Sequence, residues 1–121
     1  MKEINYDPEG DILTVHFLDN AAKHAGLEIT DNIVLYFDTV NEKPLEMILI
    51  CYSRLVKYTR KNPLKLKLSK YPKRLQRTAL KLIQQPPVSN FLKLKVSDSE
   101  AYHTVRVKKL VLEPKILEEA V

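Results

Sequence analysis

The sequence predicts an α+β fold: an antiparallel β-sheet built from hairpins, with one main amphipathic helix over residues 72–85 packed on one face. Short runs of alternating apolar and polar residues fill the first half of the chain, and turn residues separate these runs. One stretch in the second half has helical apolar spacing and ends at a pair of prolines. We expect about six or seven strands in the sheet.

The first hairpin is predicted from residues 3–18. Residues 12–18 alternate between apolar and polar side chains, as a strand with one buried face does. The preceding segment 7–11 reads Asp-Pro-Glu-Gly-Asp, and these residue types favour a turn. Residues 3–6 are therefore expected to pair with residues 12–18.

Three further strands are expected in the first half. They lie around residues 27–29, at 33–37 and at 45–52, and the Asn-Glu-Lys-Pro turn at 41–44 separates the last two. Residues 45–52 are apolar at both parities, which is typical of a central strand covered on both faces. The predicted helix is the element expected to cover the second face.

The helix prediction rests on start and stop signals. Pro72 suits a first helical position, and the helix is expected to end before Pro86. Four residues between them fall on one apolar stripe: Leu75, Ala79, Leu82 and Ile83.

Two Leu-Lys segments, residues 64–68 and 92–96, flank the helix and read as strands with one apolar and one basic face. A last strand is expected over 102–112, with a bulge near 108–109 where its apolar parity switches. Residues 53–62 and 114–121 give no clear pattern.

The charge is divided along the chain. Residues 1–50 hold three basic and ten acidic side chains, for a net charge of −7, whereas residues 51–121 carry +12. We expect one domain over 1–121, made of an acidic β-hairpin part (1–52) and a basic extension (53–121) with the order strand, helix, strand, strand. A basic segment of this kind attracts polyanions or an acidic protein surface, including the acidic half of a second copy.

The first half resembles a known bacterial family, the domain of unknown function 2283. The resemblance covers residues 1–50 and is carried by Lys2-x-x-x-Tyr6-Asp7-x-Glu9-x-Asp11-x-Leu13-x-Val15, then Phe37-Asp38, a turn and Leu45-Glu46-Met47-Ile48. It implies a small β-hairpin domain and no catalytic residue, since the family has no assigned activity. Similar chains are suspected of being partners in toxin–antitoxin pairs. The family domain typically ends near residues 51–55, so the basic extension lies outside the resemblance.

Several classes of chemistry are excluded by residue usage. Gly10 and Gly26 are the only glycines, so the chain has no Gly-rich phosphate loop, and it has no Gly-x-Ser-x-Gly motif. Cys51 is the only cysteine, which excludes an internal disulfide and favours a reducing compartment. It reads as a small buried hydrophobe of the 45–52 strand. The chain shows no signal-peptide or membrane-spanning pattern, so we expect a cytoplasmic protein without a membrane anchor.

Candidate metal and acid–base groups are few. Asp7, Glu9 and Asp11 alternate around a turn, an arrangement that suits Ca²⁺ or Mg²⁺, but the turn itself already explains these residue types. The histidines, His16, His24 and His103, have no paired spacing. We therefore expect no catalytic residue, no metal and no cofactor.

The basic residues are the remaining candidates for a site. Those predicted to contact nucleic acid or an acidic partner are Lys65, Lys67, Lys73, Arg74, Arg77, Lys81, Lys93 and Lys95. Tyr58, Tyr71 and Tyr102 are candidate base-stacking groups. Lysine on an outer strand face also protects a sheet edge, and charge on a helix surface is also plain solvation.

The leading functional hypothesis from sequence is a non-enzymatic interaction module that binds a protein partner or itself, in the manner of an antitoxin. The alternative is a small basic protein that binds nucleic acid.

Overall fold

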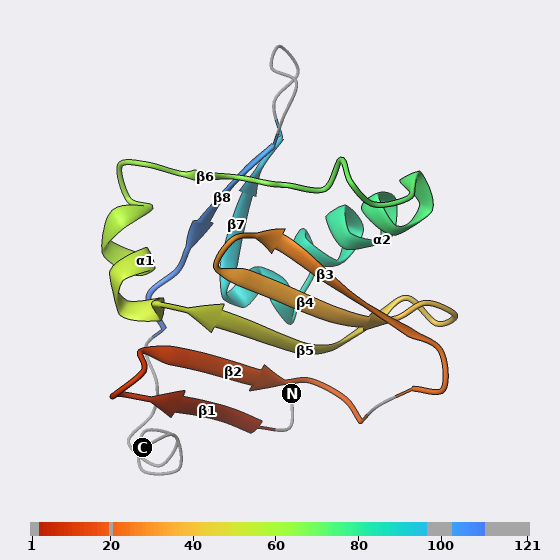
Figure 1. Cartoon of the computed structure of the whole chain (residues 1–121), viewed down its shortest axis with the longest axis horizontal. Helices are drawn as coiled ribbons and strands as arrows, with labels where there is room; N and C mark the ends of the chain where they lie inside the picture. Colours follow the sequence, from red (N-terminus) through yellow and green to blue (C-terminus); the bar gives the residue numbers. More distant parts are fainter. Residues whose placement is uncertain (1–2, 20, 97–102, 111–121) are drawn as a thin grey trace.

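The computed structural model describes residues 3–19, 21–96 and 103–110 and confirms the α+β class (Figure 1). Its strands are antiparallel, as expected, but they divide between two sheets rather than joining in one. Each half of the chain supplies one of the two sheets.

The large sheet has five strands in the order β1-β2-β5-β4-β3. These strands are β1 (Glu3–Asp7), β2 (Ile12–His16), β3 (His24–Thr30), β4 (Ile33–Asp38) and β5 (Lys43–Ile50). The first hairpin is confirmed, with Glu3 opposite His16 and Asp7 opposite Ile12. The turn between β4 and β5 lies at residues 39–42, two residues earlier than expected. The Asp38 carboxylate fixes it by accepting hydrogen bonds from the Val40 and Asn41 backbone N–H groups, at 2.8 and 3.0 Å.

The small sheet has three strands in the order β6-β8-β7, and β7 and β8 run across the direction of β2 and β5 in Figure 1. The remaining elements of the second half surround it. They are α1 (Tyr52–Tyr58), β6 (Leu64–Lys65), α2 (Lys73–Ile83), the 3₁₀ helix η1 (Val88–Asn90), β7 (Leu92–Lys95) and β8 (Thr104–Val107). The strands predicted over 64–68 and 102–112 are thus shorter than expected. The last strand ends at Val107, before the parity switch at which the sequence predicts a bulge; residues 102, 111 and 112 lie outside the described residues.

Helix α2 forms within the predicted range, and three residues of the predicted stripe, Ala79, Leu82 and Ile83, are buried, whereas Leu75 is partly buried and Thr78 is buried as well. The expectation that it covers the second face of the 45–52 strand is wrong. The three buried stripe residues belong to the same buried cluster as Met47 and Leu49, so α2 lies on the inner side of the large sheet. In the described part of the chain, no helix lies on the outer face of β5.

The chain leaves the large sheet at Cys51, where the sequence predicts that the strand continues. Cys51 has a φ of 62°, in the left-handed region, and α1 begins at Tyr52. The cysteine is therefore half-buried at a strand–helix junction rather than buried within a strand. The Asp11 carboxylate, 42 residues away in sequence, accepts hydrogen bonds from the Ser53 backbone N–H at 2.9 Å and from the Ser53 hydroxyl at 2.8 Å.

The hydrophobic core lies between the inner faces of the two sheets and the two helices. One cluster of buried side chains contains residues of both halves of the chain, from Ile4 to Val107. At its centre Phe17, just after β2, meets Phe91, just before β7, edge to face with ring centroids 6.0 Å apart. Both side chains are almost fully buried.

The β3 edge of the large sheet is covered by the segment that joins β6 to α2. The Lys67 N–H donates to the Ile29 carbonyl at 2.8 Å, and the Glu28 N–H donates to the Tyr71 hydroxyl at 2.8 Å. These bonds satisfy backbone groups that an edge strand would otherwise leave open to another chain.

Candidate anion-binding surface and ligand pocket

The outer face of the small sheet is basic. Lys65 and Lys95 both pair with Thr104, and Lys93 lies opposite Arg106. Residues paired across antiparallel strands point to the same side, and so do residues two apart along a strand. The four cations therefore share the face opposite the buried Val105 and Val107, and all four are exposed. We call this surface the basic face.

A groove continues the basic face toward α1. Five cationic side chains and no carboxylate line it among the described residues: Arg60, Lys93, Arg106, Lys108 and Lys109. We call it the cationic groove. The Arg106 Nε–H donates to the Thr59 carbonyl at 3.1 Å, which holds the guanidinium in place. Lys108 is also anchored, since its Nζ donates to the Ser89 carbonyl at 2.8 Å.

Three of the four predicted strand lysines share this face, and the fourth does not. Lys67 follows β6 and forms an ion pair with Asp31 at 2.8 Å. The sequence pattern also did not identify Arg106, because one arginine in the alternating Thr-Val-Arg-Val segment gives no signal until β8 is placed between β6 and β7.

The cations of α2 lie apart from the basic face and are partly engaged with the first half of the chain. Lys81 forms an ion pair with Glu42 at 2.9 Å, and this hydrogen bond, together with the lysine's charge, holds the pKa of the Glu42 carboxyl below its usual value. Arg74 reaches the Thr39 carbonyl at 3.4 Å. Lys73 and Arg77 are exposed, and their side chains form no hydrogen bond or ion pair with another described residue.

The predicted stacking tyrosines are not gathered on the basic face. Tyr58, at the end of α1, is 55% exposed, whereas the Tyr71 hydroxyl is occupied by the Glu28 N–H. Tyr102 lies outside the described residues. Charge, rather than aromatic stacking, is therefore the main chemistry of this surface in the described part of the chain.

The outer face of the large sheet has the opposite character, and we call it the acidic face. The strand registers place an apolar centre on it, with carboxylates around that centre and one lysine, Lys43, at the border opposite Asp38. The apolar residues are Ile12, Val34, Tyr36, Ile48 and Ile50, and the acidic ones are Glu3, Asp7, Glu28 and Glu46. Ile50 is 37% exposed.

The turn carboxylates have structural roles. Asp7 accepts a hydrogen bond from the Glu9 N–H, as expected of a turn. Asp11 is nearly buried and accepts hydrogen bonds from Ser53 and, at 2.7 Å, from the Tyr6 hydroxyl. Burial raises the pKa of the Asp11 carboxyl, but the hydrogen bonds from Ser53 and Tyr6 lower it by more than burial raises it. The net pKa therefore lies below the usual value. Among the residues that the structure describes, no group of three acidic, histidine or cysteine side chains could hold a metal ion.

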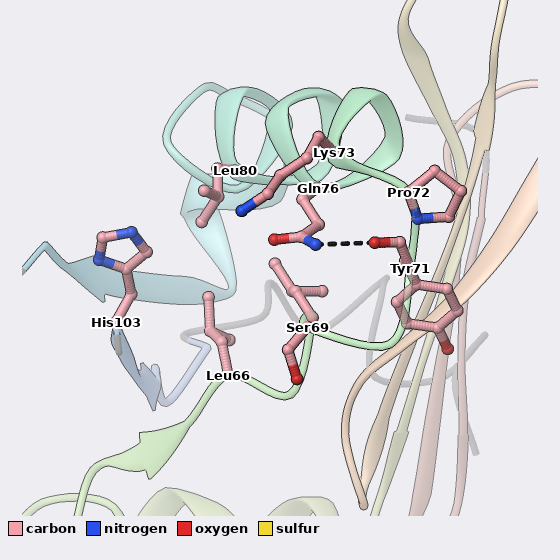
Figure 2. A pocket seen from close by; sticks show the side chains of 9 residues that line it. Leu66, Ser69, Tyr71, Pro72, Lys73, Gln76, Leu80 and His103 are labelled. Carbon is pink, nitrogen blue, oxygen red and sulfur yellow. Dashed lines mark hydrogen bonds between the residues drawn. The ribbon is translucent and has the colours of Figure 1, made fainter. Parts of the chain in front are cut away.

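The histidines do not come together. His16 lies near Asp19, with Nε2 and Oδ1 3.7 Å apart, and His24 contacts the Ala21 carbonyl through Nδ1. His103 lines a pocket of about 590 Å³ between the start of α2 and the segment before it (Figure 2). Its Nδ1 is shielded from solvent and has no hydrogen-bond partner among the described residues.

Comparisons with known proteins give no relative: no family model, no curated protein and no solved structure matches the chain. The resemblance of residues 1–50 to the family described above therefore stays a prediction. Neither helix in the described part of the chain has the length and apolar character of a membrane span.

Proposed function

We propose that this protein is a non-enzymatic module that binds nucleic acid through the basic face and the cationic groove. The observation that carries the proposal is the pairing of Lys93 directly opposite Arg106. Like charges at directly opposed positions destabilise a sheet, so the arrangement is unfavourable for the free protein. A phosphate backbone lying across the strands would offset this repulsion.

The distribution of the other charges supports the same proposal. Lys81 and Lys67 are used within the fold, in ion pairs with Glu42 and Asp31, so they do not compete with the basic face as a binding surface. The acidic face belongs to the other sheet and would repel a polyanion. A polyanion is thus favoured on the basic face and disfavoured on the acidic face. Because the described tyrosines are not gathered on the basic face, we expect binding through phosphates with little sequence preference.

The test is fluorescence anisotropy with short single-stranded DNA and RNA of mixed sequence at about 50 mM salt. We expect micromolar binding, weakened more than about tenfold in the variant Lys93→Glu/Lys95→Glu. The matched control, Lys73→Glu/Arg77→Glu, changes the net charge by the same amount on α2 and should weaken binding by less than about threefold. The first variant should fold well, because the new carboxylate at position 93 would lie opposite the positive charge of Arg106.

A second candidate, a module that binds a protein partner, is favoured by the acidic face. Its apolar centre and acidic border fit a protein surface with an apolar patch bordered by lysine and arginine. An antitoxin-like role belongs to this class. If no oligonucleotide binds at low salt, or if both double variants weaken binding equally, the nucleic-acid proposal is wrong and this candidate takes its place.

A further inference from the structure

The pocket in Figure 2 is separate from the basic face, and its lining combines apolar and polar side chains in about equal measure. Its lining comes from the segment after β6, the first turns of α2 and the residue before β8. Leu66, Leu68 and Leu80 supply apolar surface. Its volume, about 590 Å³, lies in the range of small-molecule sites.

The polar groups that reach the pocket favour an anion. None of the described residues that line it is an aspartate or a glutamate. Figure 2 shows the Lys73 amine pointing into the space between α2 and Leu66. Lys73 has no hydrogen-bond or ion-pair partner among the described residues, so its charge is available to a ligand.

Gln76 and His103 supply two further polar groups to the pocket. The Gln76 amide is held by a hydrogen bond, whereas one ring nitrogen of His103 has no hydrogen-bond partner among the described residues. The Gln76 side-chain N–H donates to the Tyr71 carbonyl at 2.7 Å, which fixes the amide (Figure 2). Because Nδ1 of His103 is shielded and has no partner in the described part of the chain, Nε2 is the ring nitrogen left for a ligand. An unmet acceptor costs less than an unmet donor, which favours the proton on Nε2.

From this arrangement we infer that the pocket binds a small carboxylic acid with an apolar body. The carboxylate lies against the Lys73 ammonium and accepts a hydrogen bond from the His103 Nε2–H, and the apolar body contacts Leu66 and Leu80. A carboxylate fits better than a phosphate ester, because the described lining contains one lysine and no arginine fork. This inference does not depend on nucleic-acid binding.

The test uses octanoate as the probe, followed by NMR shifts of the backbone amides of the full-length protein. We expect saturable shifts confined to residues 66–80 and 103–105, with a dissociation constant on the order of 0.1–1 mM for a ligand of this size. Two controls separate the two parts of the ligand. Acetate has the charge without the body, and 1-octanol has the body without the charge; each should bind at least about fivefold more weakly.

Two variants on α2 locate the charge contact. Lys73→Met keeps most of the side-chain length without the ammonium and should weaken octanoate binding at least about fivefold, whereas Arg77→Met, outside the pocket, should leave it unchanged. The inference is overturned if octanoate causes no shifts up to about 10 mM, if octanol binds equally well, or if Lys73→Met binds octanoate as the wild type does. Oligonucleotide binding by Lys73→Met should be preserved in every case, so the two proposals fail separately.

Discussion

Replacing Phe91 by alanine is expected to lower the free energy of unfolding by about 3–5 kcal/mol, the largest effect that we expect from any single substitution in this protein. The side chain is 1% exposed and meets the Phe17 ring at the centre of the core. Truncation removes its buried apolar surface, leaves a cavity and ends the edge-to-face contact between a residue of each half. The measurement is urea denaturation followed by both far-ultraviolet circular dichroism and tyrosine fluorescence.

The same experiment tests whether the two halves fold together. Because one buried cluster joins them, we expect the two probes to give one coincident transition in the wild type and in Phe91→Ala. Phe91→Leu fills most of the space and should cost only about 1–1.5 kcal/mol. Two separate transitions, with the large sheet still folded after the first, would contradict a shared core.

Replacing Asp11 by alanine is expected to cost about 2–3 kcal/mol. Its carboxylate accepts hydrogen bonds from the Tyr6 hydroxyl and from two groups of Ser53, and it joins the first hairpin to the start of α1. Its φ of 53° is also tolerated by aspartate better than by alanine. Asp11→Asn keeps an acceptor and the backbone preference, so it should cost less than the alanine variant.

The Asp11 contribution should depend on pH in a defined direction. The folded-state pKa lies below the usual value of 3.8, so the ionised form stabilises the fold above that pH. This stabilisation is lost as the pH falls from 3.8 through the folded-state pKa. The difference in unfolding free energy between wild type and Asp11→Asn should therefore be larger at about pH 7 than at about pH 3. An equal difference at both pH values would show that the carboxylate charge contributes nothing.

Local patterns in the sequence predict most of the large sheet and α2. The first hairpin follows from alternation and from the turn residues between Asp7 and Asp11, which are neighbours in sequence. The apolar stripe of α2 is likewise a local signal, and three of its four residues are buried in the structure. Such elements are found because their periodicity is contained in one short window.

The features that the sequence did not reveal depend on residues far apart in the chain. Helix α1 has no capping side chain in its own sequence, because Asp11 supplies the acceptor from the first hairpin. The apolar pattern of β5 suggests cover on both faces, yet Ile48 and Ile50 lie at the centre of a face that no described helix covers. Arg106 joins the basic face only through the strand order of the small sheet, which local periodicity does not determine.

The most direct test of the proposed function is the salt dependence of oligonucleotide binding, measured by anisotropy between about 50 and 200 mM salt. With about four phosphate contacts on the basic face, a plot of log K against log salt should have a slope of about −3 for a single strand. In Lys93→Glu/Lys95→Glu the slope should fall to about half this value or binding should disappear, while Lys73→Glu/Arg77→Glu should keep the wild-type slope. A slope near zero, or a slope that falls only in the α2 variant, would contradict the account.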